Sequence, residues 1–463
     1  MGGRSYYALD LSNINSPSLK FQINPSAVTS GPLSHMGQSW SKPTIAWVNW
    51  GGQRKQVLFV GGGYDAGGVD GDARDASGVK IPYAGYESDT YNQTNGIGAG
   101  VYMFDAENGE LLFWSSKHAT TSAVTENGAN AVIGHNDADM QYSVPSEIRT
   151  VDRDGDDLVD HLYFGDLGGQ VFRIDLDNKA VTKGGFVKHS QRILDLNTGA
   201  HADKRPRFYD MPSFSIYNHA GETFAVISVG SGNRSSPLKD YTTGTSGYEH
   251  DAIYNVYDKD VARKDLYTYT TGGLYTQNVA KAAMGEVTNS NRNDYTTLVA
   301  PYSTGGWYYR FQSNKLQSEK VFGTPLAMNF QLFVSTFDGS KPGLSGDCGA
   351  GVKGESYMNR FCLPFGQCKP EFAGTGGGDP TCTDASCDKS KLGPGIHTGT
   401  VVGGEPPPPC TGPSCTPPPR PGSGENYCVS TGGRMPFNPH GGTGPGEQTS
   451  ICLIPNRWYE KFR

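Results

Sequence analysis

The chain has 463 residues, enough for one large domain or for two to three ordinary ones, and its formal net charge is −7 without any basic run. This charge argues against nucleic acid or an anionic membrane surface as the main partner, and no apolar stretch approaches the roughly 18 residues that a membrane-spanning helix needs. With 63 glycines, 25 tyrosines and 20 phenylalanines but only 18% charged residues, the composition is typical of a turn-rich β protein.

A loose unit of three strands recurs from residue 1 to about residue 340. Its first strand follows a turn proline, its second ends in small residues, and its third ends in Asp. The first strands are expected at 43–48, 145–148, 212–216 and 325–328, the second at 57–62, 162–165, 225–230 and 332–335, and the third at 101–105, 171–175 and 253–258. Residues 6–10, Tyr-Tyr-Ala-Leu-Asp, are a solitary copy of the third strand.

Repeated groups of short strands predict an all-β fold built as a β-propeller, because one small sheet cannot bury both of its faces alone. The solitary copy at 6–10 indicates that the chain enters in the middle of a blade. An irregular β-sandwich is the alternative. Helical periodicity is thin, and residues 277–286 are the best candidate for a short helix.

The chemistry of the chain is most specific between residues 150 and 175. Asp152, Asp154, Asp156 and Asp160 occupy positions one, three, five and nine of a calcium-type loop, and Leu158 at position seven would offer its backbone carbonyl. Carboxylates on alternate residues of a tight loop converge and repel one another unless a cation lies among them. Calcium accepts six to eight oxygen ligands at variable angles, so the loop predicts Ca²⁺ rather than Mg²⁺ or Zn²⁺.

Two departures from the EF-hand pattern limit how far the comparison with an EF-hand can be taken. Position six is Asp157, a residue type that tolerates the left-handed conformation usually given to glycine, and position twelve is Tyr163 in place of a bidentate Glu. Strands are expected after the loop instead of a helix. We expect His161 to face solvent, and the alternative interpretation of the loop is an acidic surface turn that binds nothing.

Asp65, Asp70 and Asp72 form a second acidic group, in a glycine-rich insertion. They could make a weaker cation site, although a solvated loop is the more ordinary interpretation.

All nine cysteines lie between Cys348 and Cys452, within sequence rich in glycine and proline. This pattern favours disulfides formed in an oxidising compartment, whereas paired Cys-x-x-Cys zinc motifs are absent. The N-terminus lacks the features of a signal peptide, and both facts fit the C-terminal portion of a longer exported protein. We therefore expect a propeller domain at 1–345, with its calcium loop at 152–160, and a largely irregular region at 346–463.

Several segments resemble the C-terminal domain of the PilC/PilY family of type IV pilus assembly proteins and tip adhesins. These segments are residues 2–10, 37–43, the acidic loop with the following Gly-Asp-Leu-Gly-Gly-Gln-Val-Phe-Arg at 165–173, 230–238 and 319–321. The resemblance implies a modified propeller related in shape to the quinoprotein dehydrogenases, seven-bladed in the complete domain, with its early blades missing or degenerate here.

The resemblance also implies function. It implies a calcium site on Asp152, Asp154, Asp156, the Leu158 carbonyl and Asp160, whose occupancy is tied to pilus extension and retraction. The family acts at the outer membrane and pilus tip with minor pilins, in surface or host-cell attachment and in twitching motility.

Two other functions are compatible with parts of the sequence. One is a quinone-dependent dehydrogenase, in which calcium would hold the cofactor, and the other is a purely adhesive module stiffened by calcium. The first is disfavoured because the loop supplies its own ligands, and the second because there is one loop rather than several. The chain lacks GxSxG, HExxH and GxxxxGK[ST] motifs, so we assign no catalytic residue and expect a protein that is not an enzyme.

Overall fold

A computed structural model of the chain describes residues 3–65, 93, 96–120, 124–126, 130–197, 204–268, 273–328, 330–343, 353–368, 389–397, 427–431 and 449–453. This part of the chain contains β-strands and short 3-10 helices and no α-helix. The 3-10 helices are η1 (Pro25–Ala27), η2 (Pro32–His35), η3 (Lys183–Gly185) and η5 (Lys281–Ala283). Within these residues there is no helix with the length and hydropathy required to cross a bilayer.

Four sheets follow one another along the chain, and we number them blades one to four. Blade one has the strand order β3-β4-β5-β6-β8-β7, and blade two has the order β9-β10-β11-β12. The strands of blade one are β3 (Thr44–Trp50), β4 (Gln53–Gly61), β5 (Val101–Asp105), β6 (Leu111–Ser116), β7 (Val124–Glu126) and β8 (Asn130–Asn136). Those of blade two are β9 (Arg149–Val151), β10 (His161–Gly165), β11 (Gln170–Leu176) and β12 (Val187–Asp195).

The second half of the molecule repeats this plan. Blade three has the order β13-β14-β15-β17-β16, and in blade four β20 pairs with β18, β19 and β21, and β21 with β22. Blade three contains β13 (Ser213–His219), β14 (Glu222–Gly230), β15 (Ala252–Asp258), β16 (Gly285–Glu286) and β17 (Gly306–Arg310). Blade four contains β18 (Glu319–Val321), β19 (Leu326–Met328), β20 (Gln331–Asp338), β21 (Glu355–Cys362) and β22 (Lys389–Pro394).

Two further pairs of strands lie outside the four blades. Strands β1 (Tyr6–Asp10) and β2 (Ser18–Ile23) form one two-stranded sheet, and β23 (Tyr427–Thr431) and β24 (Thr449–Leu453) form another. Ile23 joins a hydrophobic cluster with Val60, Tyr102 and Phe104 of blade one. The N-terminal pair therefore packs against blade one.

Each pair of successive blades encloses its own hydrophobic core. Leu162 and Phe164 of β10 pack with blade one, whereas Tyr163 between them packs with blade three. Trp307 of blade three packs against Phe361 of blade four in a third cluster. The blades are thus stacked face to face, which is how propeller blades bury the two sides of each small sheet.

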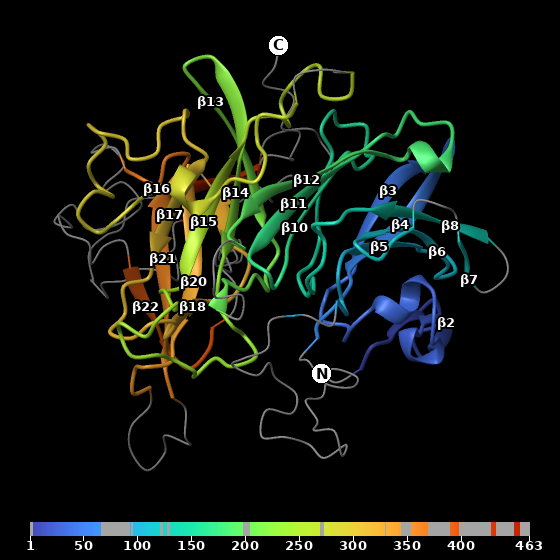
Figure 1. The fold of residues 1–463 in the computed structure, drawn as a ribbon, viewed down its shortest axis with the longest axis horizontal. Helices are drawn as coiled ribbons and strands as arrows, with labels where there is room; N and C mark the ends of the chain where they lie inside the picture. Colours follow the sequence, from blue (N-terminus) through green and yellow to red (C-terminus); the bar gives the residue numbers. More distant parts are fainter. Residues whose placement is uncertain are drawn as a thin grey trace, which may run out of the picture.

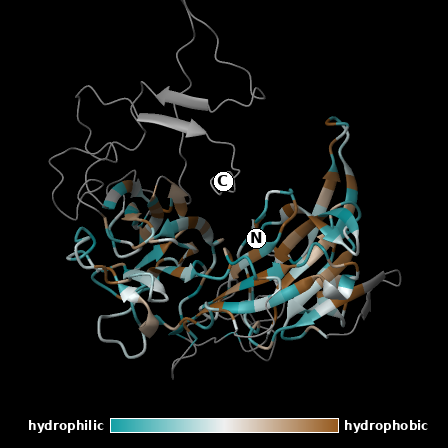
Figure 2. Ribbon diagram, turned by 90° about the horizontal axis from the view of Figure 1, so that it is seen from above, coloured by the Kyte–Doolittle hydropathy of each residue, from teal (hydrophilic) through white to brown (hydrophobic). Residues whose placement is uncertain are grey.

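The figures show this order in space. Figure 1 shows the sheets succeeding one another across the molecule, from the blue strands of blade one through green to the orange strands of blade four. Figure 2 shows the hydrophobic residues concentrated on the strands and the hydrophilic residues on the connections. The expected all-β, propeller-type fold is confirmed, whereas a two-sheet sandwich does not describe four successive blades.

Three expectations from the sequence are wrong in detail. Residues 277–286 contain η5 and the short β16 in place of an α-helix. The strand expected at 145–148 begins later, as β9 at Arg149. The propeller does not end at residue 345, because β21 pairs with β20 along its whole length and β22 pairs with β21. The Cys- and Gly-rich composition hid these last strands, and most of the remaining C-terminal region lies outside the described residues.

One disulfide lies in blade four. Cys362, the last residue of β21, is bonded to Cys368. This pair confirms the expectation of disulfide bonding for two of the nine cysteines. The other seven cysteines have no described side chain.

Candidate metal centre

The acidic loop connects two paired strands of blade two. Strands β9 and β10 are antiparallel, with Val151 opposite His161. The amide of Asp160 donates to the carbonyl of Val151 at 2.9 Å, which closes the loop at its base. The loop is therefore anchored at both ends by a β-ladder, as the sequence predicted from the strands that follow it.

Local hydrogen bonds curl the backbone of this loop. Asp152 accepts from the amide of Gly155 at 2.6 Å and from that of Asp157 at 2.9 Å. Gly155 and Asp157 have φ values of 78° and 65°, in the left-handed region that glycine and, less readily, Asp adopt. The expectation that Asp157 replaces the usual glycine in a left-handed conformation is confirmed.

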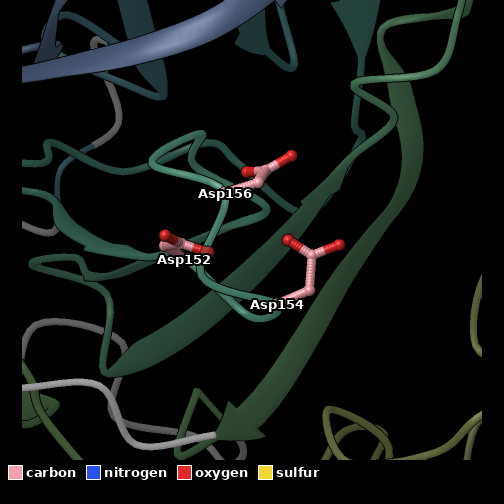
Figure 3. A group of neighbouring side chains, drawn as sticks. All are labelled: Asp152, Asp154 and Asp156. Carbon is pink, nitrogen blue, oxygen red and sulfur yellow. The ribbon is translucent and has the colours of Figure 1, made fainter.

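Three carboxylates converge inside this curl. Asp152, Asp154 and Asp156 each place an oxygen within 4.8 Å of the other two. Figure 3 shows the three side chains around one turn of the loop. A calcium ion lies roughly 2.3–2.6 Å from its ligands, so oxygens on one ion are at most about 5 Å apart. The spacing of the three carboxylates is therefore compatible with three ligands of one calcium ion.

The electrostatics of the group favour a bound cation. Partial burial raises the pKa of Asp156, and the negative charges of Asp154 and Asp152 raise it further. Burial likewise raises the pKa of Asp160, with Asp154 adding to the effect. Both carboxyl groups therefore hold their charge less easily than in water, and a divalent cation would stabilise the charged form.

Asp160 and Leu158 lie differently from the three converging residues. One oxygen of Asp160 accepts from the amide of Arg153 at 2.8 Å, and the other accepts from the side chain of Asn178 at 3.1 Å. The amide of Leu158 donates to Asp156 at 2.9 Å. Asp160 therefore stabilises the loop through hydrogen bonds to Arg153 and Asn178. Its predicted role as a ligand, like that of the Leu158 carbonyl, stays a prediction.

The prediction that His161 faces solvent is wrong. His161 is fully buried, and its Nδ1 lies 2.7 Å from Oδ1 of Asp175. Strand β10 has no solvent face, because blade two lies between blades one and three. Tyr163, at position twelve of the loop pattern, is also buried and donates to Asp258 of blade three at 3.0 Å.

Several residues that hold the loop in place were not predicted from the sequence. Asn178 joins it to blade one, since its side chain donates to Val159 and accepts from the amide of Asn49. Arg153 and Tyr267 join it to blade three: Arg153 donates to the carbonyl of Arg263, and the hydroxyl of Tyr267 donates to the carbonyl of Asp160. No sequence signal marked these residues, because each depends on segments far apart in the chain.

The second acidic group gives no comparable site in the described part of the chain. Asp65 is buried, and Asp70 and Asp72 lie outside the described residues. Among the described residues, Asp152, Asp154 and Asp156 form the group of acidic, His or Cys side chains close enough to share an ion. Asp154 and Asp156 are exposed, which suits an ion that exchanges with solvent.

Comparison with solved structures finds proteins of similar fold. No protein-family model and no curated protein sequence matches the chain. The fold is similar to the crystal structure of the C-terminal domain of PilY1 from Pseudomonas aeruginosa, with a TM-score of 0.47 and 15% sequence identity. The match covers 79% of this chain and 66% of that chain, slightly less than two thirds of its length. PilY1 belongs by name to the family that the sequence motifs resemble.

Proposed function

We propose that this chain is a calcium-binding, non-enzymatic component of type IV pili that acts in pilus assembly and at the pilus tip. The convergence of Asp152, Asp154 and Asp156 within one strand-anchored loop carries this proposal. Bound calcium neutralises the three carboxylates and fixes the distances between them. Asp160 and the Leu158 carbonyl complete the ligand set, as the spacing of the sequence predicts.

We propose that bound calcium orders the backbone of this loop. Without the ion, repulsion among the carboxylates opposes the curl that the Gly155 and Asp157 amides stabilise. With the ion, both the backbone hydrogen bonds to Asp152 and the calcium–carboxylate bonds stabilise the curl. The loop between β9 and β10 then adopts a single conformation. We propose that the surface of this loop governs the balance between pilus extension and retraction, and through it surface attachment and twitching motility.

The cellular setting rests on the sequence motifs and on the cysteines. The motifs at 2–10, 37–43, 165–173, 230–238 and 319–321 resemble those of the PilC/PilY family. The Cys362–Cys368 bond suits an exported protein, because disulfides persist in oxidising compartments. We therefore place the protein at the cell surface, outer membrane and pilus tip, with minor pilins as its partners.

An allelic-replacement experiment tests this function. In the source bacterium, the chromosomal gene is replaced by one that encodes Asp154→Ala with Asp156→Ala, and pilus number and twitching are measured. We expect both to change while the protein level stays the same. The matched control replaces two exposed acids at other β-hairpins, Glu107→Ala with Glu222→Ala, and should behave as the wild type. Normal pili and normal twitching in the loop variant would refute the proposed role of calcium.

A further inference from the structure

The calcium loop is connected to a segment of blade three. This segment, residues 259–268, follows β15 and is described as a series of turns. Arg153, between the ligand positions Asp152 and Asp154, donates from its guanidinium to the carbonyl of Arg263. The same guanidinium lies 5.5 Å from the ring centre of Tyr267. One side chain of the loop thus makes two contacts with one short segment of the neighbouring blade.

Tyr267 makes a second connection, from the segment of blade three back to the loop. Its hydroxyl donates to the carbonyl of Asp160 at 3.3 Å, at the last residue of the loop. Its ring lies 6.2 Å from the ring of His161, the first residue of β10. The segment therefore contacts the loop near its beginning, through Arg153, and at its end, through Asp160.

The segment is itself held firmly by blade three. Asp258 at the end of β15 accepts from the amides of Asp260 and Val261. Asp260 is fully buried and accepts from Arg263 at 3.1 Å. Leu266 is fully buried as well. A shift of the loop therefore acts on a segment that is attached to the core of the next blade.

We propose that residues 259–268 report the calcium state of the loop to blade three, with Arg153 and Tyr267 as positioning residues. This inference rests on the proposed calcium site and adds the route by which its occupancy reaches a second blade. Ligand binding and segment order are reciprocally linked, so whatever orders the segment must also tighten the binding of calcium. Arg153 and Tyr267 hold the loop in the curl that calcium requires.

The positive charge of Arg153 makes the proposal testable, because the two possible roles of this residue predict opposite changes in calcium affinity when the charge is removed. Removing a positive charge beside a cation site tightens binding if the charge acts only through electrostatic repulsion. Removing a residue that holds the ligands in place weakens binding. Arg54 is the matched control, because its positive charge acts on Asp156 while its guanidinium lies over Trp47 of blade one, 5.0 Å from the ring centre.

The experiment combines calorimetric titration with CaCl₂ and amide hydrogen exchange on the whole chain. We expect Arg153→Gln to weaken calcium binding about tenfold, within the range of typical coupling, and Arg54→Gln to leave it unchanged or tighten it. Tyr267→Phe, which removes only the hydroxyl, should weaken binding about threefold, as expected for one weak hydrogen bond. Tyr275→Phe is its control, because Tyr275 is 69% exposed and lies against Arg263.

Hydrogen exchange separates the segment from the loop. In the wild type, calcium should slow exchange in both 152–160 and 259–268, and in Arg153→Gln only in 152–160. Calcium binding without protection of 259–268, or tighter binding by Arg153→Gln, would overturn this inference and leave the proposed calcium site intact. A wild-type chain that binds no calcium would overturn both.

Discussion

Arg173 of blade two and Asp258 of blade three form a fully buried ion pair. Nη1 of Arg173 lies 2.6 Å from Oδ1 and 2.7 Å from Oδ2 of Asp258, and neither side chain is exposed to solvent. Arg173 also pairs with Asp175, which in turn bonds His161. The strand that leaves the acidic loop is therefore tied to the next blade by charge as well as by apolar packing.

Removing one charge from this pair should destabilise the fold strongly. Asp258→Asn leaves Arg173 buried with less compensation, and breaking a buried ion pair costs about 3–5 kcal/mol. We therefore expect the free energy of unfolding of Asp258→Asn, measured by urea denaturation, to be lower than that of the wild type by this amount. Asp265→Asn removes one exposed partner of Arg263, which keeps its pair with Asp260, and should cost less than about 1 kcal/mol. Equal stability of the two variants would contradict a structural role for the buried pair.

The backbone at Asp157 gives a second prediction, in calcium-free protein. Asp157→Gly and Asp157→Ala both remove the exposed carboxylate, so they differ mainly in the cost of a Cβ at φ 65°. The left-handed conformation costs Ala about 1 kcal/mol relative to Gly. The Gly variant should therefore be more stable than the Ala variant by that amount in thermal unfolding. An Ala variant as stable as the Gly variant would show that the loop is not curled in this way.

A buried carboxyl in the turn after β10 predicts a pH dependence. Burial raises the pKa of Asp166 to about 7, although its carboxylate accepts from the amides of Gly168 and Gln170. The folded state binds this proton more tightly than the unfolded state does. The stability that the protonated Asp166 contributes is therefore complete below about pH 4 and is lost as the pH rises through 7.

Asp166→Asn keeps an oxygen for both amides and removes the titration. The wild type should lose roughly 4 kcal/mol of its free energy of unfolding between pH 4 and pH 8, and Asp166→Asn should not, since each pKa unit is worth about 1.4 kcal/mol. The variant should therefore become more stable relative to the wild type by that amount. Urea unfolding at both pH values measures this difference. A difference that does not change with pH would mean that Asp166 is charged throughout.

The bond between Cys362 and Cys368 gives a prediction for blade four. Peptide mapping without reductant should recover these two cysteines linked to each other. Replacing both with Ser should lower the free energy of unfolding by about 2 kcal/mol, because the bond closes a short loop in the unfolded chain. Two freely alkylated thiols in the native, oxidised protein would rule out the bond.

The sequence predicted the strands that have strong local signals. Strands at 6–10 and 101–105 match β1 and β5 residue for residue, because an apolar run ended by Asp marks both limits. Strand β9 was misplaced because Arg149 and Thr150 break the apolar pattern. Strand β21 was missed because its Glu, Ser, Asn and Arg residues lie in a region whose composition predicts irregular chain.

The sequence also predicted the shape of the loop, but not its surroundings. Alternate carboxylates bring Asp152, Asp154 and Asp156 together through local geometry alone. The burial of His161 and the pairing of Arg173 with Asp258 depend on the stacking of blades, which a local pattern does not contain. The support from Asn178, Arg153 and Tyr267 was hidden for the same reason.

Calorimetric titration of the purified chain with CaCl₂ tests the central claim most directly. We predict one saturable site in the wild type, and none in Asp154→Ala with Asp156→Ala, whose β-type circular dichroism should be unchanged. Extracellular calcium modules bind with dissociation constants of about 10⁻⁴–10⁻³ M, so the titration should extend to roughly 10 mM. Absence of binding by the wild type at that concentration, or identical binding by the variant, would contradict a calcium site on this loop.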